Sequence, residues 1–187
     1  ILLGILACAG FGLLNGALVT KVRLPSFIVT LGTLNIAMAL VHIYSNEETI
    51  GNPPSAMLFF GRTFTIGGTD ITYGVVLMLA LFALAWFVLT QTAWGSRVYA
   101  VGNNPEATRL SGSRTDRLLI SVYITAGVIY GIAALLLVAR TQVGDPNAGQ
   151  TDNLDSIIAV VLCGASLFGG RGSVVGSLIG ALIIGVI

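Results

Sequence analysis

Long apolar segments alternate with short polar segments along this 187-residue chain. A helix that crosses the hydrocarbon core of a bilayer needs about 20 apolar residues, with a usable range of about 17–25. The segments that qualify for consideration are 2–20, 27–43, 73–92, 118–139, 157–169 and 174–187. The fifth is short, which favours a half-span or a re-entrant segment, and the sixth stops at the end of the chain. The pattern predicts an all-α fold, a polytopic bundle of transmembrane helices over residues 1–187.

The composition agrees with a protein that lies in lipid. Hydrophobic residues make up 55% of the chain and charged residues 9%, and the mean hydropathy is +0.93. A soluble domain carries about 25% charged residues. The net charge of +1 gives no support for nucleic-acid binding. Cys8 and Cys163 lie in apolar segments without metal-ligand spacing, so we expect buried thiols. The chain begins and ends in apolar sequence without an initiator Met, which predicts a fragment of a longer protein, and a signal peptide is not expected.

The basic residues give the segments an orientation, because cytoplasmic loops carry an excess of Lys and Arg. If Lys21 and Arg23 are cytoplasmic, the alternation of spans places 93–117 inside and both 44–72 and 140–156 outside. The basic residues inside are then Lys21, Arg23, Arg97, Arg109, Arg114, Arg117 and Arg171, with Arg62 and Arg140 outside. The acids show the opposite distribution, with Glu106 and Asp116 inside and the others outside. The asymmetry therefore predicts a cytoplasmic loop 93–117.

Two further patterns concern packing and the outer loop. Glycines recur at intervals of four in 12/16, 127/131 and 172/176/180, a spacing that allows helix backbones to approach closely in lipid. In the outer loop, the sequence RTFTIGGTDIT (62–72) predicts a β-hairpin with a Gly67-Gly68 turn. The hairpin is interpreted as a plug, a docking surface or a rigid connection, and the residues do not choose between these roles.

The inner loop contains the sequence GNNPEATRLSG (102–112), which predicts a short capped helix. Asn104 is a suitable N-cap and Pro105 a suitable first helical residue. Glu106 and Arg109 complement the helix dipole, and Gly112 fits a left-handed C-cap. The helix is too short to cross a bilayer or to be stable alone, so something must hold it. It either lies flat under the membrane or fits a groove in another protein. The small apolar surface, limited to two residues, Ala107 and Leu110, favours the groove.

Three stretches carry a specific resemblance. They are GSRVYAVGNNPEATRLSG (95–112), LDSIIAVVLCGASLFGGRGSVVGSLIGALIIG (154–185) and GLLNGALVTKVRLPSFIVTLGTL (12–34). Together they resemble the permease subunit of bacterial ABC importers for monosaccharides of the ribose, xylose and fructose type. The resemblance covers almost the whole chain and is weakest in the loop 44–72. Family members commonly have GGN where this chain has Gly102-Asn103-Asn104. They also commonly have an apolar residue at the position where this chain has Ser113.

The resemblance implies a role for the inner loop and a set of partners. The loop would be the coupling helix that sits in a cleft of the ATPase subunit, formed by Gly102, Asn103, Asn104, Pro105, Glu106, Ala107, Arg109, Leu110, Ser111 and Gly112. The implied partners are ABC ATPase subunits, an external sugar-binding protein and a second permease subunit, identical or different, in the bacterial cytoplasmic (inner) membrane. The outer acids Glu47, Glu48, Asp145, Asp152 and Asp155 are either part of the docking surface for the binding protein or ordinary solvated charge.

The chain has no phosphate-binding loop of the type GxxxxGK[ST] and no HExxH or Ser/His/Asp set. We therefore expect no enzyme activity, no cofactor bound by this chain and no metal site, with ATP hydrolysis on a separate subunit. The single histidine, His42, is expected to be a hydrogen-bonded interfacial side chain rather than a metal ligand.

A neutral sugar needs uncharged hydrogen-bonding groups along its path. The path candidates are Asn15, Thr30, Thr33 and Asn35, and the other polar residues in predicted spans are Ser121, Thr125 and Ser166. Asn15 and Asn35 are favoured, because a buried amide is costly without a partner or solute. The alternative is hydrogen bonding between helices. The alternative functions are a permease of the same superfamily for branched-chain amino acids or nucleosides, and an ATP-independent secondary transporter. The latter usually needs charges within its spans.

Overall fold

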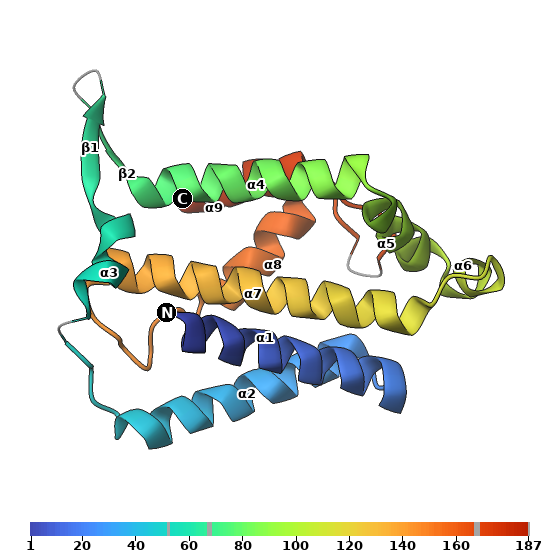
Figure 1. The fold of residues 1–187 in the computed structure, drawn as a ribbon, viewed down its shortest axis with the longest axis horizontal. Coiled ribbons are helices and arrows are strands. Elements are labelled where there is room, and N and C mark those ends of the chain that lie inside the picture. The colour runs from blue at the N-terminus through green and yellow to red at the C-terminus, as the bar shows by residue number, and fades with distance from the viewer. Residues whose placement is uncertain (52, 67–68, 167–168, 187) are drawn as a thin grey trace. The chain divides into compact units, whose positions relative to one another are not determined.

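The computed structural model describes residues 1–51, 53–66, 69–166 and 169–186, and most of them are helical (Figure 1). The chain divides into two compact units, each built from two stretches of sequence. The first unit contains Ile1–Val76 and Leu119–Ala148, and the second contains Leu77–Leu118 and Gly149–Ile187. The all-α class predicted from the sequence is confirmed.

Four helices in the described part of the chain are long and apolar enough to cross a membrane. They are Leu2–Val22, Ser26–Ser45 (α2), Tyr73–Gln91 (α4) and Thr115–Thr141 (α7). The first combines α1 (Leu2–Ala17) with a π-helical turn, η1 (Leu18–Val22). The first four predicted spans are therefore confirmed. At most 17% of the residues in their apolar windows are buried within this chain, so their outer surfaces are left for lipid or other protein.

In the first unit, α1 and α7 pack through glycines on both helices. A Cβ atom at Gly12 would collide with the carbonyl of Tyr123, and one at Gly127 would collide with the carbonyl of Cys8. A Cβ at Gly131 would lie 2.9 Å from the Cα of Ile5. Only hydrogen fits at these positions, so the two backbones approach as closely as the glycine spacing predicts.

The outer loop of the first unit is more structured than the sequence indicated. It contains α3 (Ser55–Leu58), the 3-10 turn η2 (Phe59–Gly61) and the strands β1 (Thr63–Ile66) and β2 (Thr69–Thr72). The strands pair antiparallel, which confirms the hairpin, whereas its predicted Gly67-Gly68 turn lies outside the described residues. The ring of Tyr73 stacks on Phe59 at 5.3 Å and lies 4.9 Å from Phe64, so the hairpin is fixed to the start of α4.

The second unit contains most of α4, then α5 (Ala93–Asn103), α6 (Pro105–Leu110), α8 (Asp152–Leu162) and α9 (Val174–Val186). The fifth predicted segment, 157–169, is corrected: its helix begins earlier and ends at Leu162, because Gly164 takes a left-handed φ of +83°. The 11 residues of α8 span about 16 Å, roughly half of a bilayer core. Helices α8 and α9 pack closely, since a Cβ at Gly180 would collide with the carbonyl of Ala159.

Candidate functional site

The short inner helix α6 forms with the caps that its sequence predicts. Asn104 has extended backbone angles, and its side-chain oxygen accepts a hydrogen bond from the Ala107 N–H at 3.0 Å. At the other end, the Gly112 N–H donates to the Arg109 carbonyl at 3.0 Å, and the Ser113 N–H donates to the Thr108 carbonyl at 3.3 Å. Gly112 has φ +85°, so these two bonds close the helix in the Schellman pattern. The capped helix predicted at 102–112 is confirmed.

Thr108 is the residue of α6 that sequence reasoning did not include. Its side chain is 8% exposed, and its hydroxyl donates to the Asn104 carbonyl at 2.9 Å. The Ser111 hydroxyl in turn donates to the Thr108 carbonyl at 2.7 Å. Thr108 thus lies on the buried side of α6 and its hydrogen bonds stay within the helix, whereas Leu110 on the same helix is 85% exposed. The only sequence signal for this residue is a threonine four residues after an N-cap asparagine.

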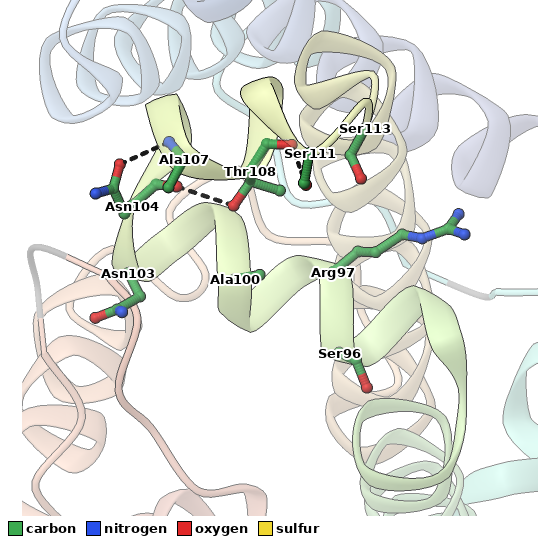
Figure 2. A pocket seen from close by; sticks show the side chains of 9 residues that line it. All are labelled: Ser96, Arg97, Ala100, Asn103, Asn104, Ala107, Thr108, Ser111 and Ser113. Atoms are coloured by element: carbon green, nitrogen blue, oxygen red, sulfur yellow. Dashed lines mark hydrogen bonds between the residues drawn. The ribbon is translucent and has the colours of Figure 1, made fainter.

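Helix α5 directly precedes α6 and was not predicted. It begins after Thr92, whose hydroxyl oxygen accepts a hydrogen bond from the Gly95 N–H at 3.2 Å, and it ends at Asn103. Asn104 alone separates the two helices, which face each other across an open groove of about 470 Å³ (Figure 2). The groove is lined by Ser96, Arg97, Ala100, Asn103, Asn104, Ala107, Thr108, Ser111 and Ser113. The segment 93–117 is therefore a pair of helices joined at a capped corner rather than a loop with one helix.

The loop between α8 and α9 packs against the end of α5. The Tyr99 hydroxyl donates to the Gly172 carbonyl at 3.2 Å, and the backbone of Gly102 touches that of Gly169 and Gly170. The sequence placed Arg171 of this loop on the same side as 93–117, but no pattern indicated that the two segments touch. Ser166, expected within a span, lies in this loop after the end of α8.

The four path candidates do not form one cluster. The Thr33 hydroxyl donates to the Asn15 side-chain oxygen at 2.7 Å, which links α2 to α1, and Thr33 is only 6% exposed. Thr30 donates to backbone carbonyls of its own helix. The Asn35 amide, on an exposed side chain, donates to the Leu31 carbonyl at 2.9 Å. The structure thus brings Asn15 and Thr33 together, and the Thr33 hydroxyl also lies 3.1 Å from the Thr30 carbonyl oxygen. Asn35 shares no hydrogen bond with these three residues among those of the described part of the chain. The Thr125 hydroxyl also bonds within its helix, to the Ser121 carbonyl at 2.8 Å.

The expectation for His42 is wrong in part. Its Nδ1 is buried without a hydrogen-bond partner among the described residues, as is the hydroxyl oxygen of Ser45 one turn later. Cys8 and Cys163 are free and half-buried rather than fully buried. Within 1–51, 53–66, 69–166 and 169–186, His, Cys, Asp and Glu side chains form no group of three or more that would hold a metal ion.

Comparison with known proteins decides the family. The family model described as "Branched-chain amino acid transport system / permease component" matches residues 1–187. The chain belongs to this permease family. With its four membrane-length helices in the described residues, this permease is a multi-pass membrane protein, and the predicted location in the bacterial cytoplasmic membrane is confirmed.

Curated relatives of this permease are sugar import permeases. The chain is 49% identical over 189 residues to the fructose import permease protein FrcC of Rhizobium meliloti, an alignment that covers 98% of this chain and 52% of the relative. It is 39% identical to the ribose import permease protein RbsC of Escherichia coli K12, covering 95% of this chain and 56% of the relative. The ribose import permease protein RbsC of Bacillus subtilis is 38% identical to the chain, and the alignment covers 91% of this chain and 53% of the relative. The chain spans about half the length of these relatives. No solved structure matches it significantly.

Proposed function

We propose that this chain is part of a permease subunit of an ATP-driven importer, which passes a monosaccharide delivered by an external binding protein. Its relatives are permease subunits for fructose and ribose. ATP hydrolysis would take place on separate ATPase subunits, and the permease would act as a dimer with an identical or a different subunit.

The observation that carries this proposal is the helix α6. Caps at both ends hold it in shape, Thr108 is buried on one side of it, and Leu110 presents an 85% exposed apolar side chain. A six-residue helix fixed in this way is preorganised for a partner surface, because little conformational entropy remains to be lost when it binds. The partner that we propose is the ATPase subunit, and the coupling residues are those predicted from 102–112.

Two contacts support the proposed sidedness of the loops. In the first unit, Ile50 and Gly144, from the two proposed outer loops, exchange backbone hydrogen bonds of 2.9 and 2.8 Å. In the second unit, Tyr99 and Gly172, from the two proposed inner loops, share a hydrogen bond. Loops that touch each other must lie on the same side of a membrane.

A second candidate substrate comes from the family description, which names branched-chain amino acids. A zwitterion favours helix ends or charges along its path. Helices α1, α2 and α4 contain no Asp, Glu, Lys or Arg. A neutral sugar therefore fits better, and uptake of labelled ribose or fructose in competition with unlabelled leucine separates the two candidates.

The test uses the full-length protein, expressed with its binding protein and ATPase subunit. We expect Glu106→Arg, which reverses the charge of the first turn of α6, and Gly112→Pro, which cannot adopt φ +85°, to insert normally while ATP hydrolysis loses its link to uptake. Asp116→Arg, which makes the same charge reversal in the first turn of α7 at an exposed position outside 102–112, is the matched control and should transport normally. Normal coupled transport by both α6 variants removes the assignment of the coupling helix.

A further inference from the structure

The last turn of α5 meets the α8–α9 loop in a close backbone contact with glycines on both sides. A Cβ atom at Gly102 would lie 2.5 Å from the Gly170 backbone nitrogen, and one at Gly170 would lie 2.7 Å from the Asn103 Cα. A Cβ at Gly169 would lie 3.1 Å from the Gly102 carbonyl oxygen. We call this meeting of Gly102 with Gly169 and Gly170 the glycine contact. Real Cβ atoms do not fit at the first two distances, so a side chain at either position would force the two segments apart.

The α8–α9 loop is shaped to make this contact. Gly169 and Gly170 have φ values of +92° and +75°, a conformation that side chains resist. The Ser166 N–H donates to the Arg171 carbonyl at 2.9 Å, which closes the loop on itself. Tyr99 adds a second tie, through its hydroxyl and the Gly172 carbonyl at 3.2 Å. The glycine contact is therefore a fixed meeting of two structured backbones.

The two sides of the contact lead to different parts of the second unit. On one side, Asn103 is followed directly by Asn104, the N-cap of α6. On the other side, the loop joins α8 to α9, which pack so closely that a Cβ at Gly180 would collide with Ala159. A displacement of α6 thus reaches α8 through the close backbone contacts at Gly102, Gly170 and Gly180. Close-packed backbones transmit such a displacement instead of absorbing it through rotamer changes.

We propose that the glycine contact passes the movement of α6 to the α8–α9 pair, and that Gly102 and Gly170 are positioning residues for coupling. This inference rests on the proposed function, since it takes α6 as the element that the ATPase subunit moves. It adds the element of the permease to which the movement is passed, the α8–α9 pair. In this role neither glycine touches the solute. Both act by keeping the corner between α5 and α6 in register with the α8–α9 loop.

The test compares glycine-to-alanine variants of the full-length permease, reconstituted with its ATPase and binding protein in proteoliposomes. Gly170→Ala adds a methyl group at the contact, where φ is +75°. Gly164→Ala is the matched control, because it has φ +83° in the same loop and nothing within 4 Å of its Cβ position. We expect Gly170→Ala to lower the sugar imported per ATP hydrolysed by about tenfold, with the ATPase subunit still co-purifying, and Gly164→Ala to change it by less than about twofold.

Equal import per ATP in the two variants overturns the proposal. If Gly170→Ala fails to assemble, Tyr99→Phe decides, because it removes one hydroxyl and leaves the packing intact. Its expected result is a drop of about threefold in import per ATP at unchanged thermal stability, and an unchanged ratio overturns the proposal. A failure of the proposed function gives a different result. In that case no ATPase subunit would co-purify with the wild-type protein, or the wild-type protein would import no sugar.

Discussion

Gly112 shows how a single residue holds the end of α6. Its φ of +85° permits the two backbone bonds that close the helix, and its Cβ position has nothing within 4 Å. Alanine there would meet no neighbour and would suffer only from the backbone conformation. We expect Gly112→Ala to lower the free energy of unfolding of this corner by about 1 kcal/mol, and Gly112→Asn by less, because asparagine tolerates the left-handed region.

Hydrogen exchange of the α6 amides in the full-length protein measures this loss. Gly51, which also has open space at its Cβ position but no positive φ, provides the control substitution. An asparagine variant that exchanges as fast as the alanine variant would contradict the conformational explanation.

Thr33 and Asn15 form the second residue-scale feature, a polar pair between α2 and α1. Thr33→Val would leave the half-buried Asn15 oxygen without this donor, which costs about 1 kcal/mol, whereas Thr33→Ser keeps the hydroxyl. We expect valine to lower the thermal stability of the purified protein and serine to preserve most of it. Equal stability of the two variants would show that the pair does not hold the helices together.

A substitution at Asn35 distinguishes a role in helix packing from a role in transport. Its side chain is exposed and bonds only to the Leu31 carbonyl of its own helix among the hydrogen bonds found in the described residues. We expect Asn35→Leu to leave thermal stability unchanged, because no second helix depends on it. If it also leaves sugar uptake unchanged, Asn35 does not belong to the path, and a raised KM for uptake at normal stability would place it there.

At the scale of helices, the α1–α7 interface predicts opposite effects for the same substitution at two glycines. Gly127→Ala places a methyl group against the Cys8 carbonyl and should cost about 1–3 kcal/mol. Gly10→Ala, with nothing within 4 Å, should be neutral or stabilise α1 by up to about 1 kcal/mol. The thermal stability of the detergent-solubilised protein measures both. Similar stability of the two variants would contradict the close approach of α1 and α7.

The elements that sequence analysis predicted correctly are those with local signals. The four long helices follow from the length of their apolar segments. Helix α6 follows from Asn104, Pro105 and Gly112, whose effects on the backbone extend over only a few neighbouring residues. Helix α5 was missed because its sequence AWGSRVYAVGN mixes glycine, charge and apolar residues without a clear period. The end of α8 was missed because apolar residues continue beyond Leu162, although the backbone turns at Gly164.

The relations between elements could not be predicted in the same way. Asn15 and Thr33 were chosen one by one as path residues, and only the fold shows that they bond to each other. The glycine contact joins Gly102 to Gly170 across several helices, and neither glycine differs in sequence from the many others in the chain. Such contacts depend on how helices pack, which periodicity along one segment does not contain.

For the molecule as a whole, the charge asymmetry predicts which loops face the cytoplasm. We expect Arg114→Cys, an exposed position after α6, to react with a membrane-impermeant maleimide only in inside-out vesicles. Thr151→Cys, an exposed position just before α8, should react only in right-side-out vesicles. The measurement uses full-length protein without other cysteines. Labelling of Arg114→Cys from the outside would place α6 out of reach of any ATPase subunit and would overturn the importer proposal.

The meeting of Gly12 with Tyr123 also has a consequence for how the protein is made. The 110 residues between these positions take roughly 6–22 s to synthesise at about 5–20 residues per second. Helix α1 therefore enters the bilayer well before α7 leaves the ribosome, and its glycine face has no α7 to pack against during that time. Lipid chains or an insertion factor must cover that face until α7 arrives, so a nascent chain stalled before residue 115 holds α1 without its permanent neighbour.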